Sequence, residues 1–217
     1  MAQIVPAILT NDQSDFRHKY SMLFGLSHFF GKLHVDFADG EFVPAKTIRP
    51  ADLGHFLKTA PFELTAHMMT ETPGFYLKEI KAAGFRSVIF HFESMDSLAT
   101  EAFISGASQI GLSVGIAINP ETPLPKAARY LRNLNLIQLM GVHPGRQGRT
   151  FIPETVDRIR EIKRLTKHAV VAVDGGITPT NARDCARAGA DQIIVGSAIL
   201  KANNPKLALE LLTAEAR

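Results

Sequence analysis

Eight short apolar runs rich in Val and Ile alternate with longer amphipathic stretches along the sequence. Strands that alternate with helices in this way form βαβ units and a parallel sheet. The runs cover residues 3–9, 32–37, 62–68, 87–92, 112–118, 136–142, 169–174 and 191–197. Eight such units in 217 residues match a (β/α)₈ barrel, the TIM barrel fold. An open doubly wound sheet is the alternative, but it usually has a Gly-rich turn after its first strand, and "ILTNDQS" has no glycine. We therefore predict an α/β protein with a single barrel domain over residues 1–217.

Composition limits the remaining classes. Hydrophobic residues make up 46% and charged residues 21% of the chain, as in a protein with a sizeable core. No apolar run approaches the ~20 residues needed to cross a bilayer, and the N-terminus lacks the pattern of a signal peptide. The single Cys185 cannot form an internal disulfide, which fits a reducing compartment. We expect a cytoplasmic protein without a membrane partner, in which Cys185 is a small helix residue.

Basic residues are densest over residues 146–168, in a chain with a net charge of +3. From Pro153 onward these charges are interleaved with Val156, Ile159 and Ile162 at helical spacing. This pattern is typical of an amphipathic helix with a solvated face. We therefore expect no nucleic-acid partner.

Polar residues interrupt the second run, "KLHVDF", on one face only. Leu33, Val35 and Phe37 alternate with His34 and Asp36, so the last two side chains share the other face of a strand. In a barrel, active-site residues lie at the C-terminal ends of the strands. An imidazole and a carboxylate on one strand therefore mark a candidate site.

Other predicted strands also end in polar residues: His67, His91 with Glu93, and Asp174. Two imidazoles and two carboxylates could converge on one divalent ion, and mixed N/O ligands suit Zn²⁺, Fe²⁺, Mn²⁺ or Co²⁺ better than Mg²⁺ or Ca²⁺. The alternative is that each group makes its own hydrogen bond. Because burial without a partner costs roughly 1–3 kcal/mol per group, a shared ion is favoured.

Two glycine-containing loops indicate a phosphate site, which barrels often form after strands 7 and 8. Gly175 and Gly176 follow the seventh run, ahead of a helix that Thr178 would cap. Gly196 and Ser197 follow the eighth run. Either pair alone could simply make a turn, but together they favour phosphate binding.

The segments "HVDFADGEFVP", "AHMM", "INPETP", "FIPETVDRIREI", "VDGGI" and "ADQIIVGSAI" resemble the ribulose-phosphate 3-epimerase family over most of the chain. The resemblance implies a barrel enzyme that interconverts D-ribulose 5-phosphate and D-xylulose 5-phosphate in carbohydrate metabolism, with one divalent metal ion and a homo-oligomeric state, dimer or hexamer. It implies that the metal ligands are His34, Asp36, His67 and Asp174, and that Asp36 and Asp174 are the catalytic acid/base pair. The implied substrate-binding residues are His67, Met69, Met140, Gly145, Gly148, Gly175, Gly176, Gly196 and Ser197.

This chemistry requires two carboxylates. Inverting C3 removes a proton α to a carbonyl from one face and returns a proton to the other, and one carboxylate cannot reach both faces. A cation beside a carboxylate weakens it as a base, but it also stabilises the negative charge of an enediolate.

Several positions depart from the family pattern near the substrate. Ala7 stands where the family usually has Ser, and Ala38 where it has Met. In the loop "PGRQGRT", Arg146, Gln147 and Arg149 replace Phe, Gly and Gln. The arginines either contact an anionic group of the substrate, since Arg forks suit such oxygens, or face solvent in a loop of another shape.

These departures leave alternative functions open. The protein could epimerise a different ketose phosphate, or bind a sugar phosphate without catalysis, although a binder has little use for two opposed carboxylates. The related decarboxylases and hexulose-phosphate synthases carry an Asp-x-Lys-x-x-Asp motif where this chain has "LTAHMMTE" without a lysine, which counts against them.

Overall fold

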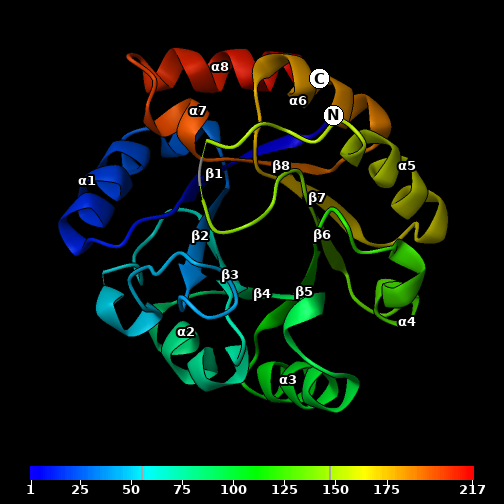
Figure 1. Ribbon diagram of the computed structural model, residues 1–217. Coiled ribbons are helices and arrows are strands. Elements are labelled where there is room, and N and C mark those ends of the chain that lie inside the picture. The colour runs from blue at the N-terminus through cyan, green and yellow to red at the C-terminus, as the bar shows by residue number, and fades with distance from the viewer. Residues whose placement is uncertain (55, 147) are drawn as a thin grey trace.

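The computed structural model describes residues 1–54, 56–146 and 148–217. Parallel strands close into one barrel in the order β1-β2-β3-β4-β5-β6-β7-β8, with helices around the outside (Figure 1). The strands are β1 (Gln3–Ile8), β2 (Lys32–Ala38), β3 (Glu63–Met69), β4 (Ser87–His91), β5 (Ser113–Ile118), β6 (Leu136–Met140), β7 (Val170–Asp174) and β8 (Gln192–Val195). Each strand overlaps one of the predicted runs, so the predicted TIM barrel is confirmed.

The helices are α1 (Gln13–Phe24), α2 (Leu77–Ala83), α3 (Ser97–Gln109), α4 (Ala128–Leu131), α5 (Thr155–Leu165), α6 (Pro179–Ala188), α7 (Ser197–Leu200) and α8 (Pro205–Glu215). Six of the helices connect successive strands, the described residues between β2 and β3 form no α-helix, and α7 and α8 follow β8. Short 3₁₀ helices add η1 (Ser27–Phe29), η2 (Pro50–Leu53), η3 (Pro73–Tyr76), η4 (Phe92–Ser94) and η5 (Leu124–Ala127). Between β2 and β3, the described residues form only η2. Among all the described residues, no helix combines the length and apolarity that a membrane span requires.

Local sequence signals explain where several helices begin and end. Thr178 caps α6 as predicted, accepting a hydrogen bond from the Asn181 backbone, and Pro179 is the first helical residue. Gly189 ends α6 with a φ of 105°, a left-handed conformation that favours glycine. Gly111 follows Ile110, the C-terminal capping residue of α3, and closes that helix with a φ of 71°.

The two faces of β2 separate core from site. Leu33, Val35 and Phe37 are buried in the large hydrophobic core between the barrel and the helices. His34 and Asp36 point into the barrel, where Asp36 pairs in register with His67 of β3. The period-2 pattern of the sequence therefore predicted this division correctly.

Candidate metal and catalytic site

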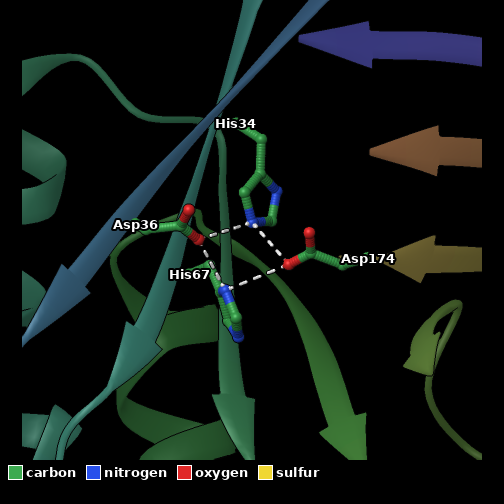
Figure 2. A group of neighbouring side chains, drawn as sticks. All are labelled: His34, Asp36, His67 and Asp174. Carbon is green, nitrogen blue, oxygen red and sulfur yellow. Dashed lines mark hydrogen bonds and ion pairs between the residues drawn. The ribbon is translucent and has the colours of Figure 1, made fainter. Parts of the chain in front are cut away.

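Four of the predicted site residues converge inside the barrel. His34 and Asp36 come from β2, His67 from β3 and Asp174 from β7 (Figure 2). One ligand atom of each lies within 4.8 Å of the corresponding atoms of the other three. All four residues are buried, with at most 9% of their surface exposed. The strands thus bring together two imidazoles and two carboxylates that lie far apart in the sequence.

The distances within this cluster suit a shared cation. His67 Nδ1 lies 2.8 Å from Asp36 Oδ1 and 3.6 Å from Asp174 Oδ2. His34 Nε2 lies 3.3 Å from Asp36 Oδ1 and 3.9 Å from Asp174 Oδ2. Tetrahedral ligands at the usual Zn–N and Zn–O lengths are about 3.4 Å apart, close to the middle of this range. His34 Nε2 is also buried without a hydrogen-bond partner among the described residues, as expected of an atom reserved for a cation.

Burial and mutual charge set the ionisation of the cluster. Burial and the negative charge of Asp36 raise the pKa of Asp174 to about 6. Burial would also raise the pKa of Asp36, but the neighbouring imidazoles of His34 and His67 outweigh it and bring that pKa below its ordinary value. Burial lowers the pKa of His34, but the Asp36 and Asp174 carboxylates more than compensate and raise it. The two carboxylates therefore differ in proton affinity although they share the same neighbours.

His91 and Glu93, the other polar residues predicted at a strand end, lie beside the cluster rather than within it. His91 Nε2 is 2.9 Å from His67 Nε2, and His91 Nδ1 faces Glu93 Oε2 at 3.5 Å. Burial lowers the pKa of His91 to about 4, so its ring is neutral and can accept a hydrogen bond. If His67 presents Nδ1 to a cation, its Nε2 carries the proton and donates a hydrogen bond to His91 Nε2. Glu93 then faces the protonated nitrogen of His91, an arrangement that fixes the orientation of a metal-binding histidine.

A pocket opens directly above the cluster. Its lining includes Asp36 and Asp174 and the predicted substrate-binding residues His67, Met69, Met140, Gly145, Gly148, Gly175, Gly176, Gly196 and Ser197. The structure therefore places all of them around one cavity. Their individual roles stay predictions.

The loops after β6 and β7 pack tightly against each other through Phe151. A Cβ atom added to Gly176, whose φ is 70°, would lie 2.6 Å from the Phe151 backbone nitrogen. A Cβ added to Gly141 would lie 2.9 Å from the Phe151 ring and 2.7 Å from the Gly175 carbonyl oxygen. Glycine is therefore required at Gly141 and Gly176 for this contact between the loops.

Two of the departures from the family pattern also line the pocket, namely Ala7 and Arg146. Ala38 instead packs with Val43 and Met69. Arg149 is exposed and is not part of the pocket lining, and Gln147 lies outside the described residues.

One residue at the site was not identified from the sequence. Gln138 is fully buried on β6 and donates a hydrogen bond from Nε2 to Asp174 Oδ2 at 3.0 Å. It is the only polar residue of the run "LIQLM" and lies two positions before Met140, on the same face. That combination was a signal that could have identified it.

The fold and the cluster define a TIM-barrel protein with a candidate divalent-metal site inside the mouth of the barrel. A family model described as the ribulose-phosphate 3 epimerase family matches residues 3–200. The chain belongs to this family, whose members are isomerases.

Individual relatives agree with this membership. The chain is 31% identical over 209 residues to ribulose-phosphate 3-epimerase of Schizosaccharomyces pombe, covering 94% of this chain and 90% of that protein. It is 30% identical over 217 residues to the enzyme of the same name from Mycobacterium tuberculosis, covering 98% and 92% of the two chains.

Solved structures support the fold. The 3-hexulose-6-phosphate synthase from Salmonella typhimurium superposes with a TM-score of 0.73 at 20% identity, covering 99% of this chain and 98% of that one. The orotidine 5'-phosphate decarboxylase from Pyrococcus horikoshii has a TM-score of 0.70 at 18% identity, covering 99% of both chains.

Proposed function

We propose that this protein is a metal-dependent 3-epimerase that interconverts D-ribulose 5-phosphate and D-xylulose 5-phosphate, with Asp36 and Asp174 as its acid/base pair. One observation carries the proposal: the Asp36 and Asp174 carboxylates, from separate strands, approach the same two imidazoles at the base of a glycine-lined pocket. The names of the relatives agree with it.

The proton moves between C3 of the substrate and the two carboxylates. One carboxylate removes the C3 proton from one face, and the other delivers a proton to the opposite face; the roles exchange in the reverse reaction. Before a cation binds, burial and the charge of Asp36 hold the pKa of Asp174 above its ordinary value, whereas the neighbouring imidazoles hold that of Asp36 below it. A bound cation would lower the pKa of both carboxyls. A carboxyl whose pKa lies close to the working pH is effective in general acid–base catalysis.

His34, Asp36, His67 and Asp174 would hold the divalent cation, and their two nitrogen and two oxygen donors suit Zn²⁺, Fe²⁺, Mn²⁺ or Co²⁺. Such a cation supplies a Lewis acid that stabilises negative charge on the enediolate. His91 would keep the His67 ring in the required orientation.

The rest of the pocket would bind the sugar phosphate. Backbone N–H groups of Gly175, Gly176, Gly196 and Ser197 would bind the phosphate oxygens. Met69 and Met140 would pack on the reacting carbons, and Gly145 and Gly148 would allow the loop after β6 to approach. We also expect, from the family resemblance, a cytoplasmic homo-oligomer, dimer or hexamer.

A second candidate is an epimerase of a different ketose phosphate. It is favoured by Ala7 and Arg146, which line the pocket where the family usually has Ser and Phe. An added guanidinium suits a substrate whose anionic group reaches the loop after β6.

Deuterium uptake at C3 tests both candidates. The protein, loaded with Co²⁺ or Mn²⁺, is incubated in D₂O with D-ribulose 5-phosphate and, separately, with hexulose 6-phosphates. We expect deuterium at C3 and formation of the 3-epimer with the pentulose phosphate. Faster exchange with a hexulose phosphate would favour the second candidate, and binding without exchange would indicate a non-catalytic binder.

A further inference from the structure

Gln138 places a primary amide inside the barrel, between two small apolar side chains. Its residue is fully buried, and its partners in register on the neighbouring strands are Ala117 of β5 and Ala172 of β7. Two small neighbours leave room for the long side chain to extend across the barrel. The amide can reach the metal-site cluster because Ala117 and Ala172 leave this space free.

The amide group contacts two members of the cluster. Gln138 Nε2 donates to Asp174 Oδ2 at 3.0 Å. A carboxylate only accepts hydrogen bonds, so the NH₂ end of the amide must be the one that faces it. The same nitrogen lies 3.3 Å from His67 Nε2 and 3.5 Å from His67 Nδ1, so it is nearly equidistant from the two ring nitrogens.

The carbonyl oxygen of the amide makes no compensating hydrogen bond among the described residues. This atom, Gln138 Oε1, is buried. An unpaired buried polar atom costs roughly 1–3 kcal/mol. A leucine or methionine would fill the layer without this cost, so the stability of the barrel does not explain a glutamine here.

The contact does explain the orientation of Asp174. Asp174 Oδ2 is the oxygen that faces the imidazoles of His34 and His67. Figure 2 shows that the second carboxylate oxygen takes no part in these contacts, and Asp174 also lines the pocket. A hydrogen bond to Oδ2 alone restricts rotation about the bond to the carboxylate, and thereby separates the roles of the two oxygens.

We propose that Gln138 is a positioning residue that holds Asp174 with Oδ2 toward the metal ligands and Oδ1 available to the substrate. Its effect on metal binding requires only the four-residue cluster, whereas its effect on turnover rests on the proposed epimerase function. Groups that orient metal ligands typically contribute about 10–100-fold to metal affinity or activity.

The test compares Gln138→Leu and Gln138→Met with the wild type and with Leu136→Met. Leu136 lies on the same strand and the same face, two residues earlier, and packs against the apolar cluster of Ile89, Ala117 and Met140, which makes it a matched control. Three quantities are measured for each protein: Co²⁺ affinity with its visible d–d spectrum, the thermal midpoint of the metal-free protein, and kcat and KM for the ketose phosphate that the wild type epimerises.

We expect both Gln138 variants to bind Co²⁺ about 10–100-fold more weakly, with an altered d–d spectrum and a kcat lowered more than KM is changed. Their metal-free midpoints should equal or exceed that of the wild type, because the unpaired oxygen is gone. Leu136→Met should match the wild type in Co²⁺ binding.

Wild-type Co²⁺ affinity, spectrum and kcat in either folded variant would overturn the inference. So would a fall in affinity matched by a lower metal-free midpoint in both variants, since that result makes Gln138 a residue of barrel stability. If the wild type binds Co²⁺ but exchanges no C3 proton, the proposed function fails while the Co²⁺ comparison still decides the role of Gln138.

Discussion

Replacing Asp174 by asparagine should abolish epimerisation and at the same time stabilise the metal-free protein. Asparagine has the same shape and can still accept the hydrogen bond from Gln138, but it cannot take up a proton. Loss of a general acid or base typically lowers the rate by about 10²–10⁴-fold. The gain in stability follows from the charge that the substitution removes.

The magnitude comes from the pKa of Asp174, which burial and the charge of Asp36 raise from an ordinary 3.8 to about 6. A raised pKa means that the native state binds the proton more tightly than the unfolded state. Stability is therefore greatest below the unfolded pKa and is lost as the pH rises through the folded pKa. At about 1.4 kcal/mol for each pH unit, the ionised carboxylate costs the native protein about 3 kcal/mol at pH 7.5 and about half as much at pH 5. Asparagine avoids this cost at every pH.

Urea denaturation of chelator-treated wild type and Asp174→Asn, between pH 5 and pH 7.5, measures the difference. The variant should unfold with the higher free energy, by about 3 kcal/mol at pH 7.5, or roughly 6–12 °C in thermal midpoint. The gap should narrow toward pH 5. If the variant is no more stable than the wild type, or if the difference in free energy of unfolding does not change with pH, the raised pKa of the buried Asp174 carboxyl is refuted. Unchanged turnover would refute the role of Asp174 in proton transfer.

Other perturbations test the remaining features. Removing bound metal with a strong chelator should stop C3 exchange, and Fe²⁺, Mn²⁺, Co²⁺ or Zn²⁺ should restore it; full activity in a preparation shown by elemental analysis to be metal-free would contradict the ligand assignment. Gly176→Ala should lower the free energy of unfolding by roughly 1–3 kcal/mol through backbone strain, and with it the thermal midpoint. It should also raise KM for the sugar phosphate, because the added Cβ would meet Phe151. A wild-type midpoint and KM would refute the tight loop contact. Burial raises the pKa of Cys185 to about 12, so a thiol reagent should modify it only after unfolding, and rapid labelling of the native protein would contradict its burial.

The barrel and the convergence of the cluster were predictable because both depend on regular geometry. The alternation of apolar runs fixed the number of strands, and the period of two put His34 and Asp36 on the inner face. Since parallel strands present their C-terminal ends at one rim, His67 and Asp174 had to lie near them. The position of Thr178 as a helix cap followed from local hydrogen bonding in the same way.

Features that depend on neighbours in space were not predictable. Gln138 acts at the site only because the residues beside it on two other strands are alanines. The sequence marks His91 only as a polar residue at the end of a strand. Its contact with the His67 ring depends on how the two side chains meet inside the barrel, which the sequence does not reveal. The path of the loop that holds Arg146 depends on packing between two loops that no local pattern encodes.

That packing has a consequence for engineering and for divergence. Phe151 meets two glycine-containing segments at once: its ring lies against Gly141 after β6, and its backbone lies against Gly176 after β7. Replacing only one of these segments with that of a relative of different sugar specificity would remove one side of the Phe151 contact. Such a replacement should therefore succeed only when both segments are exchanged together. New specificities on this scaffold are therefore expected to arise by concerted replacement of the two connections rather than through isolated point changes.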